Sequence, residues 1–481
     1  MNSDAMAAGW RGALAPTLGL SSGIALILVG AGVDSSLVAL AGTFTVALAT
    51  ALLLPEELAV VVAVYWLVVQ NLVLPAVFGS GLFPAQVVRI MVGIKEITFA
   101  LILLRLILRN RAFSLTGVDW LFIAFSVFAA CHMLLPGSLS WAEKVLALRV
   151  VLLQPMLFFI GRLFVRGEAP GERLRAVSGQ MLVLGALTGI VGLALFSLVD
   201  LDFWRDLHVA AYWTDVKGLP DSFIDNDLPG NFIRDFDESR PRLVSFPGDP
   251  LATAYFLFFV AMLYLPALRR RPLRLVPFLG VVLAALVATN TRAALLALVV
   301  AIYVYFRRMT ARPWLARLSA LATAASLLAL PAVRSVALST VEVSDPSSMG
   351  HVELTLQGLV ELRNTGLMEA LVGRGLGIAG GFTAGGDQVM GVLENIYLSL
   401  FAQLGIVGVI LFLAAMVGAL RVPTRWPEER AVKAAGVGLL ITGLVSEQMM
   451  TATSAGPFWL LLGMIGAANS SARAKPPGHA P

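Results

Sequence analysis

Four arginines lie where an apolar stretch meets polar sequence, and a cation in such a place is costly unless it has a partner or a task. They are Arg89, Arg149, Arg242 and Arg292. Guanidinium groups bind phosphate oxygens through two parallel hydrogen bonds, so these side chains could hold an anionic phosphate group. We predict this contact for Arg242 and Arg292. For Arg89 and Arg149, pairing with acids nearby in the sequence is the competing interpretation.

Two further side chains, His351 and Glu394, have the chemistry of a general base. His351 stands near the start of a predicted amphipathic helix whose apolar stripe contains Val352, Leu356 and Val360. A histidine at the margin of such a stripe is more often structural or exposed, so the periodicity alone assigns it no catalytic role. Glu394 opens an apolar run, where a carboxylate also favours a helix N-terminus. Both assignments stay open on the sequence.

The segment between these two residues is rich in glycine from Gly373 to Gly381 and contains Arg374. Glycines permit close backbone approach, but no strand precedes them, so the pattern is not a nucleotide fingerprint. The acidic and aromatic stretch Asp200–Asp249 suits carbohydrate binding by ring stacking, and rings anchored at a membrane interface explain it equally well. Its run Asp225–Asp227 lacks the spacing of a calcium loop. We predict no metal and no cofactor.

Membrane-spanning helices must position these residues. Of the 481 residues, 58% are hydrophobic and only 14% are charged, a balance that a soluble core does not absorb. Apolar runs of about 18 residues recur along the chain, and each is long enough to cross a bilayer as a helix. We therefore predict an all-α, polytopic transmembrane bundle of about 12 to 14 spans. The net charge of +5 comes without a basic stripe, so no nucleic-acid partner is expected.

The short loops rich in arginine and lysine fall on one side of this bundle, which the positive-inside rule makes cytoplasmic. Both termini then lie in the cytoplasm, and the two long polar segments lie outside. We divide the chain into N-terminal transmembrane helices, an extracytoplasmic acidic and aromatic loop, central transmembrane helices, an extracytoplasmic loop with an amphipathic helix and the glycine-rich segment, C-terminal transmembrane helices and a cytoplasmic tail. Their ranges are 1–199, 200–249, 250–333, 334–391, 392–469 and 470–481.

Five motifs follow one another in the second half of the chain. They are Arg242 with Phe246–Pro250, Asn290–Leu295, Gly350–His351, Gly373–Gly377, and Glu394–Leu398 with Leu404–Gly408. In this order they resemble the O-antigen ligase and O-antigen polymerase family of bacterial envelope enzymes.

The resemblance implies a GT-C-like glycosyltransferase of the bacterial inner membrane, with its active site on the outer face and no need for a metal. Its donor would be a polyprenyl-diphosphate-linked glycan and its acceptor a second glycan. Arg242 and Arg292 would hold the diphosphate leaving group, while Arg374, Asn395 and Tyr397 would shape the acceptor site.

The chain departs from the ligase branch of this family at one position. Ligases carry a histidine before the asparagine of the last motif, and this chain has Glu394 there. We therefore predict a polymerase of O-antigen, capsule or exopolysaccharide repeat units, with His351 or Glu394 as the base. The alternatives are a ligase that transfers glycan to lipid A core or protein, a flippase for lipid-linked oligosaccharides, and a structural partner. Expected partners are the lipid bilayer and envelope polysaccharide assembly proteins.

Overall fold

The computed structural model describes fourteen stretches of the chain. They are residues 20–30, 32–33, 35–110, 114–135, 139–165, 170–219, 224–234, 237–309, 313–328, 356, 358–360, 363, 365–379 and 395–473.

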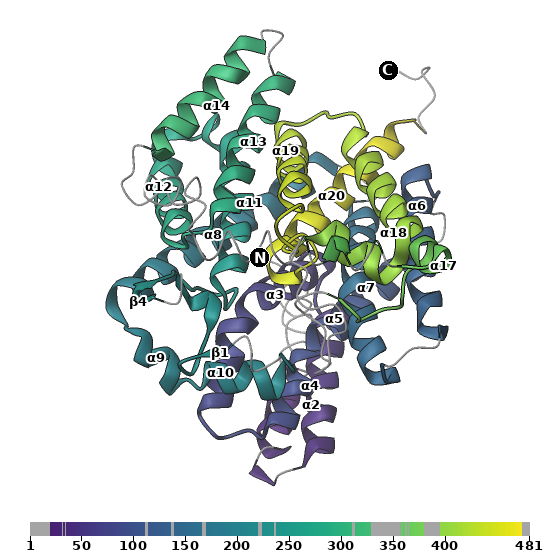
Figure 1. The fold of residues 1–481 in the computed structure, drawn as a ribbon, viewed down its shortest axis with the longest axis vertical. Helices are drawn as coiled ribbons and strands as arrows, with labels where there is room; N and C mark the ends of the chain where they lie inside the picture. Colours follow the sequence, from purple (N-terminus) through teal and green to yellow (C-terminus); the bar gives the residue numbers. More distant parts are fainter. Residues whose placement is uncertain are drawn as a thin grey trace, which may run out of the picture.

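Helices make up most of the described chain (Figure 1). The first half contains α2 (Ser36–Leu48), the π-helix η1 (Ala49–Leu53), α3 (Glu56–Gly79), α4 (Ala85–Val92), α5 (Ile94–Arg109), α6 (Gly117–Cys131), the 3-10 helix η2 (His132–Leu134), α7 (Trp141–Phe164) and α8 (Pro170–Leu198). The second half contains α11 (Pro250–Leu268), α12 (Pro272–Ala288), α13 (Arg292–Met309), α14 (Pro313–Leu328), α17 (Leu367–Val372), α18 (Ile396–Arg421), α19 (Pro427–Thr442) and α20 (Ala452–Arg473). Helices satisfy their own backbone hydrogen bonds, as a chain in lipid requires.

Seven helical stretches among the described residues are long and apolar enough to cross a membrane. They are Ser36–Leu53, α3, Gly117–Leu134, α7, α8, α11 and α18, and shorter apolar helices cover Leu20–Gly30, α12 and Ala452–Ala467. The predicted all-α class is therefore confirmed, and the chain has the helices of a multi-pass membrane protein. The predicted total of about 12 to 14 spans stays a prediction.

Helix α11 forms the centre of the bundle. It is apolar on all sides, as expected of a helix without a solvent face, and 78% of its most apolar window is buried. It packs against α8, α12, α13, α19 and α20. Asp249 caps its N-terminus and Pro250 occupies the first turn, so the helix begins at a defined point.

Helices α7 and α20 approach each other most closely at two glycines. A Cβ atom added to Gly161 would lie 1.9 Å from the carbonyl oxygen of Leu460, and one added to Gly463 would lie 1.9 Å from that of Phe158. Small residues at a helix crossing let two backbones come into contact inside a membrane. This crossing fixes the C-terminal helix against the first half of the chain.

A buried ion pair joins α6 to α7. The Arg162 guanidinium donates from Nε to Oδ1 of Asp119 at 3.0 Å and from Nη2 to Oδ2 at 3.1 Å. Asp119 also closes a capping box with Thr116 at the start of α6. The side chains are only 2% and 1% exposed, so each charge depends on the other.

The segment between α8 and α11 folds into small elements that cover one end of the bundle. They are α9 (Leu201–Asp206), α10 (Val209–Ala211), the π-helix η3 (Tyr212–Val216), the 3-10 helix η5 (Gly230–Phe232), and the antiparallel pairs β1 (Ile224–Asp225) with β2 (Leu228–Pro229) and β3 (Ile233–Arg234) with β4 (Asp237–Pro241). Trp204, Trp213 and Phe232 pack against one another here and are at most 7% exposed. These rings therefore build a second core, and two of them, Trp204 and Phe232, also line a cavity. Carbohydrate binding by this loop stays a prediction.

Candidate functional site

Two motifs that are far apart in the sequence meet at the end of α12. Arg242 donates from Nε to the carbonyl oxygen of Thr289 at 2.9 Å and from Nη2 to Oγ1 of Thr291 at 2.8 Å. Asn290, between these threonines, has a φ of 56°, which turns the chain sharply into α13 at Arg292. The guanidinium of Arg242 thus braces the turn from which Arg292 begins the next helix.

A cavity of about 310 Å³ lies beside Arg242. Its apolar wall comes from the end of α8 through Leu195, Phe196 and Val199. Its polar wall includes Asp200, Asp202, Arg205 and Arg242. The cavity is thus apolar on the α8 side, and its polar side carries two arginines beside two aspartates, which matches an amphiphile with a charged head group.

Arg205 is the residue of this cavity that the sequence analysis missed. Its Nη1 lies 2.7 Å from Oδ1 of Asp202, and its Nε donates to the carbonyl oxygen of Asn226 at 3.1 Å. The sequence gives little reason to single out Arg205, because one arginine in an acidic loop is expected to form a solvent-exposed ion pair with a neighbouring acid. Only the folding of the segment between α8 and α11 brings the two arginines to one cavity.

The charges around Asp249 lie next to this region. The Asp249 carboxylate accepts hydrogen bonds from the backbone of Leu251 at 2.8 Å and from Nδ2 of Asn231 at 2.9 Å. Burial raises the pKa of Asp249, while its backbone hydrogen bonds and the charges of Lys217 and Arg242 oppose that rise. Burial lowers the pKa of Lys217 to about 8, against the attraction of Asp249. The Lys217 ammonium also lies over the ring of Trp213, 4.7 Å from its centroid.

Arg89 and Arg149 have partners within the protein. Arg89 donates from Nε to the carbonyl oxygen of Asp215 at 2.7 Å, near the end of η3. Arg149 lies 3.5 Å from the carboxylate of Glu96, which also pairs with Lys95 at 3.4 Å. Both arginines therefore support packing near the site, and the proposal that they bind a diphosphate gains nothing from the structure.

The glycine-rich segment docks against a break in α18. Inside that helix Gly405 has φ 63° and ψ −173°, so the helix is interrupted there. The backbone N–H of Arg374 donates to the carbonyl oxygen of Ala402 at 2.9 Å, and that of Gly375 to Gln403 at 3.1 Å. The Arg374 side chain pairs with Glu369 at 3.2 Å. Hydrogen bonds from the backbone of the glycine-rich segment therefore hold it against α18.

Asn395 and Tyr397 fix the start of α18. The Asn395 side chain caps the helix by accepting from the backbone N–H groups of Tyr397 at 2.9 Å and Leu398 at 3.2 Å. The Tyr397 hydroxyl donates to the carbonyl oxygen of Leu440 in α19. These contacts explain both residues by helix geometry, and their predicted role in shaping an acceptor site stays a prediction.

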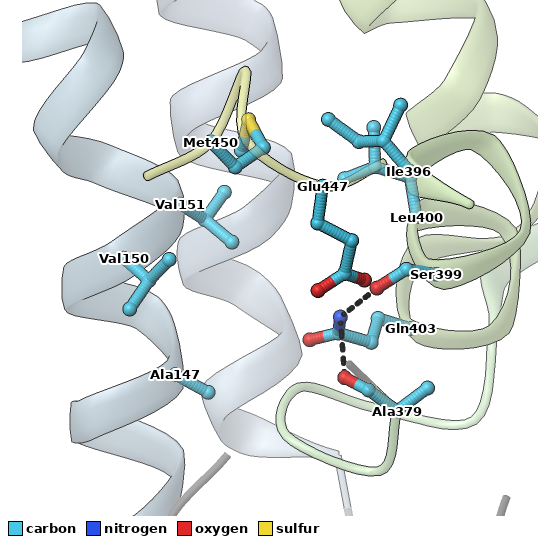
Figure 2. A pocket seen from close by; sticks show the side chains of 10 residues that line it. All are labelled: Ala147, Val150, Val151, Ala379, Ile396, Ser399, Leu400, Gln403, Glu447 and Met450. Atoms are coloured by element: carbon cyan, nitrogen blue, oxygen red, sulfur yellow. Dashed lines mark hydrogen bonds between the residues drawn. The ribbon is translucent and has the colours of Figure 1, made fainter. Parts of the chain in front are cut away.

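A second, smaller cavity of about 50 Å³ lies where α7, α18 and the turn before α20 meet (Figure 2). Figure 2 shows Glu447 pointing into it, toward Ser399 and Gln403 on α18. The sequence analysis did not single out Glu447, because it stands in a short polar turn with no recognisable motif around it. Glu447 becomes a candidate only because the fold brings its carboxylate close to Ser399 and Gln403.

The two candidate bases from the sequence, His351 and Glu394, lie outside the described residues. Within the described ranges, no group of three or more His, Cys, Asp or Glu side chains could hold a metal ion.

The described fold and its charged end define a polytopic α-helical membrane protein. Comparison with known proteins adds no narrower class. No protein-family model matches the chain, and no curated protein matches its sequence.

Proposed function

We propose that this protein is a glycosyltransferase of the bacterial inner membrane that polymerises polyprenyl-diphosphate-linked polysaccharide repeat units on the outer face. One observation carries the proposal: Arg242 lines a cavity of about 310 Å³ and hydrogen-bonds to the turn that leads into Arg292. Guanidinium groups are suited to the two phosphates of such a lipid. The apolar side of the cavity, formed by the end of α8, suits the lipid part of the same molecule.

The reaction needs little more than charge placement and a base. The acceptor hydroxyl oxygen would form a bond to the anomeric carbon of the donor sugar, while the bond from that carbon to the phosphate oxygen breaks. The electron pair leaves with the lipid diphosphate, and cations beside it stabilise the developing charge. The proton of the acceptor hydroxyl must pass to a base, for which the sequence offers His351 and Glu394.

Transport of a lipid-linked oligosaccharide is the alternative that a structural feature favours. Discontinuous membrane helices often carry the binding sites of transporters, and α18 is interrupted at Gly405. The break is occupied by the chain itself, because the backbone N–H groups of Arg374 and Gly375 donate to the carbonyl groups of Ala402 and Gln403. The polymerase proposal accounts better for the arginines at the end of the bundle, and a ligase using the same donor would differ only in its acceptor.

The test is glycan chain length in cells that carry Arg292→Ala. The matched control is Arg109→Ala, because the Arg109 side chain is 68% exposed and pairs with Glu56 away from the cavity. We expect Arg292→Ala to accumulate single lipid-linked repeats, with transfer reduced about 100-fold or more, as when one charge-stabilising donor is removed from an active site. Arg109→Ala should make glycan of normal length.

Membrane insertion of both variants is measured in parallel. Long glycan of normal abundance from well-inserted Arg292→Ala protein would remove Arg292 from the site. Lipid-linked repeats trapped on the cytoplasmic face would instead support transport.

A further inference from the structure

The cavity at Glu447 is walled mainly by apolar side chains. Ala147, Val150 and Val151 of α7 form one wall, and Ile396 and Leu400 of α18 contribute to the other. A carboxylate at the end of a membrane bundle, directed into such a space, marks a functional site more often than a packing position. Figure 2 shows that the carboxylate points toward Ser399 and Gln403, which form the polar floor of the cavity.

The turn that carries Glu447 is held rigidly. The Trp459 indole donates to the carbonyl oxygen of Met449 at 3.0 Å, and the Ser454 hydroxyl donates to that of Gln448 at 2.6 Å. The side-chain amide of Gln154 on α7 donates to the carbonyl oxygen of Met450. A side chain on a turn fixed to two helices is pre-positioned, as a group that must meet a substrate atom should be.

Gln403 organises the polar floor. Its Nε2 donates to the carbonyl oxygen of Ala379 at 3.0 Å and to the Ser399 hydroxyl oxygen at 3.1 Å. Its Oε1 accepts from the backbone N–H of Gly377 at 3.0 Å. Because Ser399 accepts from Gln403, the hydroxyl proton of Ser399 is directed to another acceptor. The floor therefore offers a fixed set of hydroxyl and amide groups opposite the carboxylate.

The volume limits what the cavity can hold. About 50 Å³ fits one or two water molecules, or one hydroxyl group with the carbon that bears it. It does not fit a sugar ring or a diphosphate. The chemistry and the size together indicate a site for a single hydroxyl group that projects from a larger molecule outside.

We propose that this cavity receives the acceptor hydroxyl of a glycan and that Glu447 takes its proton. The inference rests on the proposed glycosyl transfer. As the hydroxyl oxygen forms its bond to the anomeric carbon, its O–H bond breaks and the proton goes to the Glu447 carboxylate. The bond to the lipid diphosphate breaks in the same step, and the diphosphate leaves with the electron pair. The proton acceptor is then Glu447, in place of His351 or Glu394.

The first test compares Glu447→Gln with His351→Gln and Glu394→Gln in vesicles loaded with lipid-linked repeat units. Glu57→Gln is the matched control. Glu57 lies in the first turn of α3, and its side chain is 68% exposed and pairs with Arg173 of α8. We expect Glu447→Gln to lower the transfer rate about 100-fold or more and to abolish the rise of the rate with pH that ionisation of the base produces. Retention of the lipid-linked donor by the protein should be unchanged.

A normal rate or an unchanged pH profile in Glu447→Gln would overturn the proposal. The proposal would also be overturned if His351→Gln or Glu394→Gln abolished the pH dependence while Glu447→Gln retained it. The base would then be His351 or Glu394.

The second test does not require turnover. A small dialkyl carbodiimide adds to a protonated carboxyl group through its central carbon, so only the N=C=N group need reach the cavity, and the product rearranges to a stable N-acylurea, which retains every atom of both reactants. We expect mass spectrometry to find this adduct at Glu447 in vesicles at mildly acid pH, and soluble acceptor oligosaccharide to reduce it at least fivefold. Labelling that the oligosaccharide leaves unchanged would overturn the inference, even if the enzyme is active. If the oligosaccharide reduced labelling of Glu447 in a protein that transfers no glycan, the cavity would still be a glycan-binding site, but the proposed function would be refuted.

Discussion

The break in α18 leads to a sharp prediction about Gly405. Its φ of 63° and ψ of −173° lie in a region that only glycine occupies readily. A Cβ atom there would lie 2.3 Å from the carbonyl oxygen of Leu371 and 2.5 Å from the backbone nitrogen of Gly373. We expect Gly405→Ala to detach the segment 373–379 from α18 while the rest of the bundle stays folded.

The size of the effect follows from two costs. Backbone strain at such a position costs about 1–3 kcal/mol. The steric overlap adds to this, since the atoms involved belong to the backbone and cannot rotate away. Against these stand four hydrogen bonds between the segment and α18: the backbone N–H groups of Arg374, Gly375 and Gly377 donate three, and the Ala379 carbonyl accepts one from Gln403. Each stabilises docking by about 1 kcal/mol, so together they favour the docked state by about 4 kcal/mol. Strain at its upper value of about 3 kcal/mol, with the overlap added, offsets most of this.

Hydrogen–deuterium exchange of peptides covering 371–379 measures the docking directly. A loss of about 3 kcal/mol corresponds to about 100-fold faster exchange of these amides. Two glycines serve as controls. At Gly375 the φ is 111° and nothing lies within 4 Å of the added Cβ, so Gly375→Ala brings strain alone and should have a smaller effect. Gly280 lies in α12 with open space around it, so Gly280→Ala should leave exchange at 371–379 unchanged. Exchange in Gly405→Ala within threefold of the unaltered protein would refute the reasoning.

Two further predictions concern buried charges. Arg162→Met should lower the free energy of unfolding by about 3–5 kcal/mol, because it leaves the Asp119 carboxylate buried without its cation. Adding Asp119→Leu should restore part of the loss in thermal unfolding, short of the whole by about 1 kcal/mol because Asp119 also caps α6. For Lys217, burial lowers the pKa from 10.5 to about 8, so the unfolded chain binds more protons than the folded chain between these two values. The free energy of unfolding should therefore rise with pH from about 8 to 10.5, and Lys217→Met should remove this rise when thermal unfolding is measured across that range. A Lys217→Met protein with the same pH profile as the unaltered chain would contradict this account.

The sequence predicted the parts of the fold that depend on local pattern. Apolar runs long enough to cross a bilayer became helices such as α3, α8 and α11, because lipid leaves the backbone no other way to satisfy its hydrogen bonds. It also drew attention to Arg242 and Arg292, since cations at the ends of apolar runs are conspicuous. It could not place them in contact with one turn, because that depends on how the segment before α11 folds back over α12.

The features that the sequence did not predict depend on tertiary contacts. The apolar run through Leu404, Gly405 and Ile406 is continuous, so its sequence predicts one uninterrupted helix. The break exists because the glycine-rich segment supplies donors for the carbonyl groups of Ala402 and Gln403. Glu447 was missed for the same reason, since the polar floor opposite it forms only when that segment is docked.

The arginines that the sequence analysis singled out fall into two groups, which differ in the protein groups that surround each guanidinium. A cation beside the carbonyl groups that end a helix stabilises that helix end, whatever else the protein does. Arg89 meets this description at the end of η3, and Arg149 is matched by the Glu96 carboxylate. Arg242 also contacts a helix end, at Thr289, yet it lines a cavity to which the end of α8 contributes apolar side chains. A helix end requires only the cation, whereas a cation in a cavity that is also lined by apolar side chains suits a ligand that is anionic at one end and apolar at the other. That difference favours Arg242 over Arg89 and Arg149 as a residue that binds the lipid diphosphate.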